Sequence, residues 1–148
     1  MSPEKQLAGF MSRYSPEIIA VAEEALAKMR KRLPGAVQMV YDNYNALVVG
    51  FSPTERVSEA TFSIALYPRW VNLFFLQGVG LPDPEGLLQG DGNQVRRILL
   101  ESAAVLDKPA VRRLIEEAIK QSDSPFKKTG GQMIIKRISP KQRPRRPR

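Results

Sequence analysis

The chain contains no cysteine and no histidine among its 148 residues. Without cysteine it can form no disulfide, no thiolate metal site and no cysteine nucleophile. Without histidine it cannot build a serine–histidine–aspartate triad, an imidazole general base or an HExxH metal site. Metal binding would rest on carboxylates alone, which favour hard ions. These absences argue against an enzyme, and we expect no metal or other cofactor, although catalysis by Asp, Glu, Lys, Tyr or Ser stays open.

Long apolar runs and a leader-like start are also missing. No apolar run approaches the roughly 18 residues of a membrane span. Residues 1–17 show no basic start followed by an apolar stretch, which a secretory signal requires. The sequence therefore predicts a cytoplasmic protein without membrane association. Its length and its hydrophobic fraction of 43% suit one domain with one core.

Negative charge is absent from the C-terminal end. The net charge is +8, and all 15 acidic residues lie at or before Asp123, whereas nine of the 23 Lys and Arg residues follow Ser124. We interpret 123–148 as a basic, proline-rich tail whose last ten residues are extended and mobile. It either solubilises the chain or attaches it to nucleic acid or another polyanion. The candidate polyanion-binding residues are Lys136, Arg137, Lys141, Arg143, Arg145, Arg146 and Arg148.

Two segments have the spacing of amphipathic helices. In residues 15–35, apolar side chains recur every three or four positions, and a Pro-Gly pair ends the segment. Ser15 can cap the first turn, and Pro16 suits the first helical position. Residues 107–121 show a similar stripe, with Asp107 as the expected cap.

Between these helices the apolar period changes to two. Segments rich in β-branched and aromatic residues, separated by turn residues, predict an antiparallel meander within 36–43, 45–51, 59–67 and 70–78. A short strand is expected over Val95 to Leu100, and Met133 to Ile135 form an edge strand or a docking segment. This order predicts an α+β fold, with an antiparallel sheet of about five strands and the N- and C-terminal helices packed on one face.

The stretch "LLQGDGNQVRRILL", residues 87–100, places glycines beside arginines, as phosphate-binding loops do. It lacks the Gly-Lys-Ser/Thr ending of a P-loop and the third glycine of a dinucleotide fingerprint, and Asp91 adds negative charge. We therefore interpret it as a turn into a strand. Alternation then puts Arg96 and Arg97 on opposite faces, one against the carboxylates of the 83–85 loop or a helix end and the other in solvent.

The sheet also offers a candidate surface for a ligand or partner. In "YPRWVNLFF", Trp70, Asn72 and Phe74 share the face opposite to the apolar residues between them. Sheet aromatics near basic residues can stack nucleic-acid bases, but more often they complete a core under a loop. The candidate surface residues are Tyr41, Tyr67, Arg69, Trp70, Asn72, Gly90, Gly92, Asn93, Arg96 and Arg97.

The segments "VYDNYNALVVGFSPTE", "SIALYPRWVNLFFLQG" and "LPDPEGLLQGDGNQVRRI", followed by the closing helix, resemble the YdhG-like family of small bacterial proteins. The resemblance covers about residues 15–122, which leaves 1–14 as an N-terminal extension and 123–148 as the tail. It implies a compact α+β fold, grouped with YjbR and bacterial frataxin-like proteins, and no established catalytic set. In this family a histidine often stands at the position of Arg97, so a titrating or metal-binding role does not carry over to this chain.

The leading hypothesis is a non-catalytic cytoplasmic module that binds a macromolecule or small ligand through the sheet surface and residues 81–97. The alternative is sequence-independent nucleic-acid or polyanion binding through the tail. A second alternative, implied by the resemblance, is a frataxin-like iron or iron–sulfur accessory role, although the first long helix carries few acidic residues. An enzyme would require an acidic pair or an activated lysine in a pocket, with Asp83, Glu85, Asp91 and Tyr41 as the candidate positions.

Overall fold

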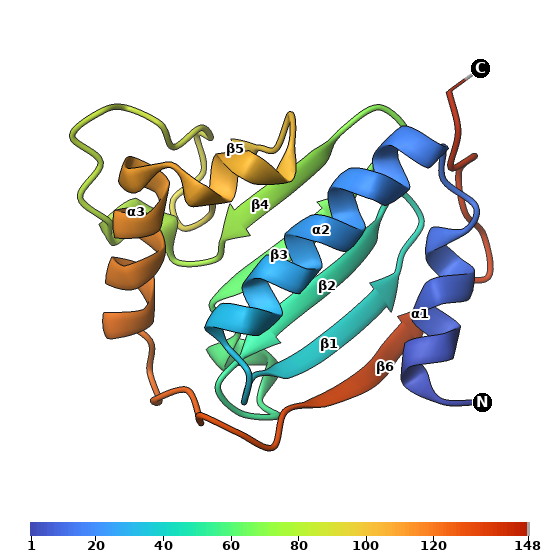
Figure 1. The fold of residues 1–148 in the computed structure, drawn as a ribbon, viewed down its shortest axis with the longest axis horizontal. Helices are drawn as coiled ribbons and strands as arrows, with labels where there is room; N and C mark the ends of the chain where they lie inside the picture. Colours follow the sequence, from blue (N-terminus) through green and yellow to red (C-terminus); the bar gives the residue numbers. More distant parts are fainter. Residues whose placement is uncertain (148) are drawn as a thin grey trace.

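A computed structural model describes residues 1–147, which form three α-helices and one six-stranded sheet (Figure 1). The helices are α1 (Pro3–Met11), α2 (Pro16–Arg32) and α3 (Pro109–Lys120). The strands are β1 (Val37–Asp42), β2 (Leu47–Ser52), β3 (Phe62–Leu66), β4 (Val71–Phe75), β5 (Arg96–Leu99) and β6 (Gln132–Ile138). The α+β class predicted from the sequence is confirmed.

The strand order across the sheet is β5-β4-β3-β2-β1-β6. All neighbours are antiparallel except β6, which runs parallel to β1. The sheet therefore has six strands, not about five, and the edge-strand alternative for Met133 to Ile135 is confirmed, because these residues lie in β6 at the edge of the sheet. Only Met133 and Ile135 of β6 pack against the core, while Lys136 and Arg137 are exposed. So short an apolar signal among basic residues is too weak to predict a full strand.

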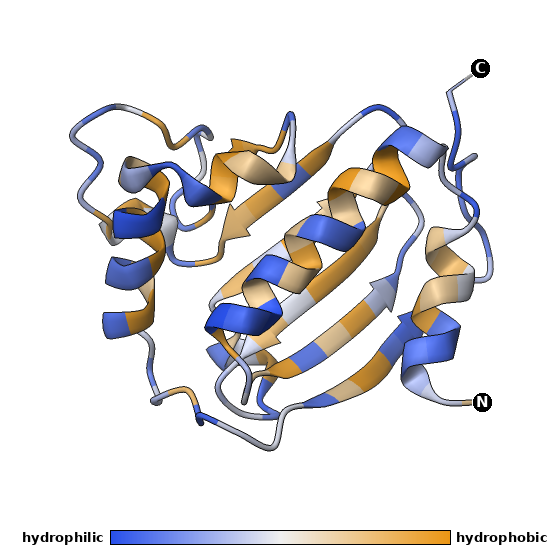
Figure 2. Cartoon of the chain, viewed as in Figure 1, coloured by the Kyte–Doolittle hydropathy of each residue, from blue (hydrophilic) through white to orange (hydrophobic). Residues whose placement is uncertain are grey.

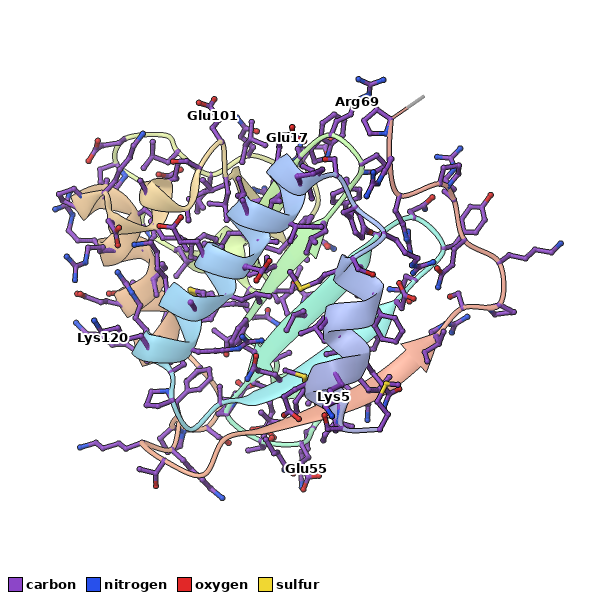
Figure 3. The ribbon with its side chains drawn as sticks, turned by 45° about the vertical axis from the view of Figure 1, so that its right-hand side comes forward. Lys5, Glu17, Glu55, Arg69, Glu101 and Lys120 are labelled. Atoms are coloured by element: carbon purple, nitrogen blue, oxygen red, sulfur yellow. The ribbon has the colours of Figure 1, made fainter. Side chains whose placement is uncertain are left out.

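Helices α1 and α2 cover one face of the sheet (Figures 1 and 3). Helix α2 contacts β3 and β4, and α1 contacts β6. Helix α3 packs on the short turn at Ala103–Asp107, which in turn contacts α2. Apolar residues line the inner sides of these elements (Figure 2). In the core, the rings of Phe62 and Phe75 meet edge to face, with their centres 5.7 Å apart.

None of the described helices combines the length and the apolar character needed to cross a bilayer.

Helix α1 occupies the segment interpreted as a plain extension. The Ser2 hydroxyl accepts a hydrogen bond from the Lys5 N–H at 3.2 Å, and Pro3 takes the first helical position. Leu7 and Met11 are buried. The same Ser-Pro-Glu start precedes α2, so the sequence does carry a start signal here. Nine residues are too few to display a convincing apolar period.

The cap predicted for α3 is wrong by one residue. Lys108 occupies the N-cap position, and the Asp107 carboxylate instead accepts a hydrogen bond from Lys28 of α2 at 2.7 Å. That hydrogen bond holds the pKa of Asp107 below its ordinary value. Asp107 therefore links two helices instead of closing one.

The chain after β6 differs from the prediction of an extended, mobile tail. The Ser139 N–H donates to the Asp42 carbonyl at 2.9 Å, and the Arg143 N–H donates to the Tyr44 carbonyl at 2.9 Å. Through residue 147, the segment folds back over the end of the sheet beside the β1–β2 turn (Figure 1). Backbone hydrogen bonds, which composition does not reveal, tie it there.

Candidate binding surfaces

The face of the sheet opposite α1 and α2 presents its side chains outward. Strand register aligns Tyr41, Val48, Ala65, Asn72 and Leu99 in one row across this face. The adjacent row holds Met39, Gly50, Ser63, Phe74 and Arg97. The alternate residues of these strands point into the core instead. Small residues lie in the middle of this open face, and larger aromatic and basic residues lie toward its edges.

The open face is hollowed at the β4–β5 edge by a volume of about 410 Å³, which we call the aromatic hollow. Its lining residues are Tyr67, Trp70, Asn72, Phe74, Gln89, Arg97 and Leu99. The Tyr67 and Trp70 rings lie 6.2 Å apart, at the two ends of one tight turn. Trp70 is 48% exposed and Leu99 is 42% exposed. Within residues 1–147, Trp70 therefore stays half exposed, and four of the predicted surface residues (Tyr67, Trp70, Asn72 and Arg97) come together.

Burial and a nearby positive charge both act on the pKa of the Tyr67 phenol in this hollow. Burial raises the pKa of the Tyr67 phenol above its ordinary value, and the nearby positive charge of Arg97 opposes that rise. Gln89 reaches the hollow because its backbone pairs with that of Arg97 in an isolated bridge. The hollow thus combines flat apolar surface with a guanidinium and two amides, so it can stack a planar group and hydrogen-bond an acceptor.

The other predicted surface residues lie outside the aromatic hollow. Tyr41 is on the open face but on β1, three strands from β4. Arg69 lies in the β3–β4 turn and points away from the molecule (Figure 3). Gly92 and Asn93 are exposed in the loop before β5.

Arg96 faces the opposite side of the sheet from Arg97, as alternation predicts. Its Nη1 donates to the carbonyls of Gly92 at 2.7 Å and Val95 at 2.8 Å, both in its own loop. Gly90 adopts a φ of +131°, which only glycine readily takes. Arg96 and Gly90 therefore shape the turn, which agrees with the interpretation of this stretch as a turn and not a phosphate loop.

A further hollow of about 370 Å³ separates the 82–88 loop from α3. The Asp83 carboxylate accepts hydrogen bonds from the backbone N–H groups of Leu87 and Leu88, both at 2.9 Å. Glu85 pairs with Arg113 at 3.2 Å. The expectation that Arg96 or Arg97 neutralises this loop is therefore wrong. Both carboxylates are engaged in shaping the loop, and neither Asp91 nor Tyr41 lines this hollow.

Another hollow, of about 590 Å³, lies between α1 and α2 above β1 and β6. Arg30 lines it and donates from Nε to the Gln38 amide oxygen at 2.8 Å. Burial lowers the pKa of Arg30 below its ordinary value. Glu4 and Glu23 also line the hollow, so its charge favours neither sign. Sequence reasoning missed it because α1 itself was not predicted.

A second basic surface lies at the end of the sheet that carries the β1–β2 and β3–β4 turns. There the C-terminal segment encloses a hollow of about 440 Å³, which we call the arginine hollow. Its lining residues are Arg13, Gln142, Arg143, Pro144, Arg145 and Arg146. Arg143, Arg146 and Lys141 are exposed here, and Lys136 and Arg137 are exposed on β6. The candidate Arg148 lies outside the described residues.

Arg145 is buried, unlike the other candidate polyanion-binding residues that the structure describes, which are exposed. Its Nη2 contacts the Asp42 carboxylate at 3.0 Å, and both side chains are 2% exposed. It also donates to the carbonyls of Asn43 and Tyr44, and its guanidinium lies 5.7 Å from the centre of the Tyr14 ring. A buried charge needs this set of partners to offset its lost hydration.

Sequence reasoning missed three residues of this cluster, namely the exposed Arg13 and the buried Tyr14 and Asp42. The other carboxylate oxygen of Asp42 pairs with Arg13 at 2.8 Å. The Tyr14 hydroxyl donates to the Leu66 carbonyl and accepts from the Leu47 N–H, each at 3.1 Å. From the sequence, residues 42–45 read as a hairpin turn, but β1 extends to Asp42. Its apolar neighbours were the only signal that this acid is buried.

Within residues 1–147, no three His, Cys, Asp or Glu side chains gather in a group able to hold a metal ion. The frataxin-like alternative thus has no donor set to argue from in that range. No family model, curated protein or solved structure matches this chain. Membership of the YdhG-like family stays a prediction from the sequence motifs.

Proposed function

We propose that this chain is a non-catalytic binding module that holds its partner on the open face of the sheet, centred on the aromatic hollow. The observation that carries the proposal is a half-exposed Trp70 beside Tyr67, with Arg97 close enough to act on the Tyr67 phenol. Large aromatic side chains are usually buried, and an exposed group of them with a polar rim is typical of binding sites. The lack of cysteine supports a cytoplasmic location.

The chemistry of the hollow suits a ligand with a planar apolar group and a negatively charged or carbonyl acceptor. The planar group would stack on Trp70, which contributes roughly 1–3 kcal/mol for a nucleobase-sized ring. The acceptor would meet Arg97, and the amide groups of Asn72 and Gln89 would select its orientation. Nucleotides and peptides with an aromatic and an acidic side chain share this chemistry.

The single tryptophan makes the proposal directly testable, because all tryptophan emission comes from Trp70. Titration with nucleoside monophosphates and with acidic aromatic peptides should shift or quench that emission for one class. Arg97→Gln should weaken the same interaction about tenfold, by loss of one charge-assisted hydrogen bond. Arg69→Gln is the matched control, since Arg69 is exposed and points away. A partner whose affinity, measured by calorimetry because Trp70→Leu removes the emission, is the same for wild type and for both variants would contradict the proposal.

A second candidate function is polyanion binding by the C-terminal basic residues. The observation in its favour is that Arg143 and Arg146 gather with Arg13 around one hollow instead of spreading along an extended chain. Binding of an oligothymidylate of about 12 nucleotides should weaken steeply between about 50 and 200 mM salt. Deletion of residues 139–148 should abolish it. Binding that survives the deletion and high salt would refute this candidate.

A further inference from the structure

We propose that the arginine hollow is a built site for the phosphates of single-stranded nucleic acid, and that Asp42 is its positioning residue. The inference rests on the second candidate function and goes beyond it. A mobile tail would attract any polyanion by charge alone, whereas here the arginines are held in place before a ligand arrives.

Fixed contacts hold the backbone around the hollow. The Gln142 amide donates to the Asp42 carbonyl at 3.0 Å and to the Ser139 carbonyl at 3.2 Å. Arg146 donates from Nε to the Arg13 carbonyl at 3.3 Å, which joins the end of the chain to the α1–α2 link. Pro144 limits the backbone between them. The segment therefore has a defined conformation and not that of a free polycation.

The charges around the hollow leave positive groups available. Asp42 offsets Arg13 and Arg145 together, because each of its carboxylate oxygens meets one of them. Among the described residues, no carboxylate pairs with Arg143 or Arg146. Four arginines thus line the hollow, only two of them contact the single negative charge of Asp42, and the surplus positive charge faces a hollow open to an anion.

Arg145 supplies an independent sign of a missing acceptor. Its Nε is the buried side-chain polar atom that lacks a hydrogen-bond partner among the described residues. A buried N–H without an acceptor is unfavourable by roughly 1–3 kcal/mol. The same side chain lines the arginine hollow, and we infer that a bound phosphate oxygen becomes the acceptor once a small side-chain shift opens this N–H to the hollow.

The residue types favour a nucleic-acid strand over other anions. Planar guanidinium groups match phosphate oxygens two at a time, which lysines do not. Tyr44 is half exposed, and the Arg143 guanidinium lies 5.9 Å from its ring centre. An exposed aromatic ring beside arginines can stack a base while the arginines hold the neighbouring phosphates.

The substitution Asp42→Asn separates the built site from a flexible polycation. It removes a negative charge, so a charge-driven tail should bind an oligothymidylate as tightly as wild type or more tightly. A built site should instead lose affinity about tenfold, because freed arginines must be reordered on binding. Arg145→Gln tests the same contact from the tail and leaves Asp42 paired with Arg13. Lys128→Gln is the matched control, because it removes one exposed tail charge away from the hollow.

The experiment is fluorescence anisotropy of a labelled oligothymidylate with these variants, after circular dichroism has shown that each is folded. We expect about tenfold weaker binding for Asp42→Asn, Arg145→Gln and Arg143→Gln, and less than about twofold for Lys128→Gln. Unchanged or tighter binding by Asp42→Asn overturns the built site but leaves polyanion attachment standing. If Asp42→Asn does not fold, Arg145→Gln decides in its place.

Two further measurements identify the source of the phosphate. They also separate the failure of this inference from the failure of polyanion binding, on which it rests. Inorganic phosphate should compete only weakly, since it lacks a base to stack. Tighter binding to phosphatidylserine vesicles than to the oligothymidylate would overturn the nucleic-acid assignment. If wild-type protein binds neither oligothymidylate nor any other polyanion at low salt, polyanion attachment itself fails, and the inference fails with it.

Discussion

Asp42 and Arg145 lie 103 residues apart in the chain, and their side chains form an ion pair at 3.0 Å that is almost fully shielded from water. The pair joins the end of β1 to the C-terminal segment, over the ring of Tyr14. Buried ion pairs often add little net stability, because desolvation offsets the attraction, but breaking one leaves an uncompensated charge. The contact therefore selects one position for the C-terminal segment over alternatives.

Removal of the shared carboxylate should destabilise the fold more than removal of one arginine. Asp42→Asn leaves both Arg13 and Arg145 without their carboxylate partner. We therefore expect the free energy of unfolding to fall by about 2–4 kcal/mol. Arg145→Gln should have a smaller effect, because Asp42 keeps Arg13. Urea denaturation measures both, with Asp123→Asn as an exposed control expected within about 0.5 kcal/mol of wild type. Equal losses for Asp42→Asn and Arg145→Gln would show that Arg13 contributes nothing.

The proximity of Arg97 to Tyr67 should appear in the titration of the phenol. Burial raises the Tyr67 pKa and Arg97 opposes that rise, so Arg97→Gln should raise this pKa further. Residue-assigned NMR titration of the Tyr67 ring provides the measurement. Arg69→Gln, at a position two residues after Tyr67 in the same turn but pointing outward, should leave the Tyr67 pKa unchanged. A Tyr67 pKa that does not respond to Arg97→Gln would place the guanidinium away from the aromatic hollow.

The Asp107–Lys28 pair should make a pH-dependent contribution to stability. The pKa of Asp107 lies below its ordinary value of 3.8, chiefly because of the hydrogen bond from Lys28. The carboxylate is thus favoured in the folded state, so its contribution is present above the unfolded pKa and is lost as the pH falls through the folded pKa. In Lys28→Gln, NMR titration should return the Asp107 pKa toward its ordinary value. Persistence of the low pKa in that variant would assign it to another group.

Close backbone approach at Gly131 should make this position intolerant of a side chain. A Cβ there would lie 2.6 Å from the Pro34 carbonyl oxygen and 2.9 Å from the Ala36 carbonyl oxygen, so β6 would have to shift. We expect Gly131→Ala to lower the free energy of unfolding by about 1–3 kcal/mol. Gly92→Ala is the control, because a Cβ there meets no atom within 4 Å. Similar thermal unfolding of both variants would argue against the packing of β6 on the α2–β1 turn.

Local patterns predicted much of the fold correctly. The apolar stripe of α2, the four meander strands, β5 and the stripe of α3 are all readable because each buries a face through a regular period. The same alternation separates Arg96 from Arg97 correctly. The prediction failed where burial depends on distant segments. Helix α1 is short, β6 has a weak apolar signal, and Asp107 finds Lys28 79 residues away instead of capping its own helix.

At the two candidate sites, too, local patterns predict which residues lie together but not which of them are buried. Alternation along residues 70–74 places Trp70, Asn72 and Phe74 on one face, but only the tertiary structure shows that Trp70 is half exposed while Asn72 is buried. Charge counting locates the basic C-terminal segment, but it cannot show that Arg145 is buried while Arg143 and Arg146 stay exposed.

By itself the sequence determined the class of fold, the faces of most strands and helices, and the absence of histidine and cysteine chemistry. These follow from residue type and local period. Only the tertiary structure shows that the C-terminal segment folds over the sheet, and that the ion pair of Asp42 with Arg145 holds it there. The physical reason is that a buried charge is tolerated only beside its partner, and that partner lies at the other end of the chain.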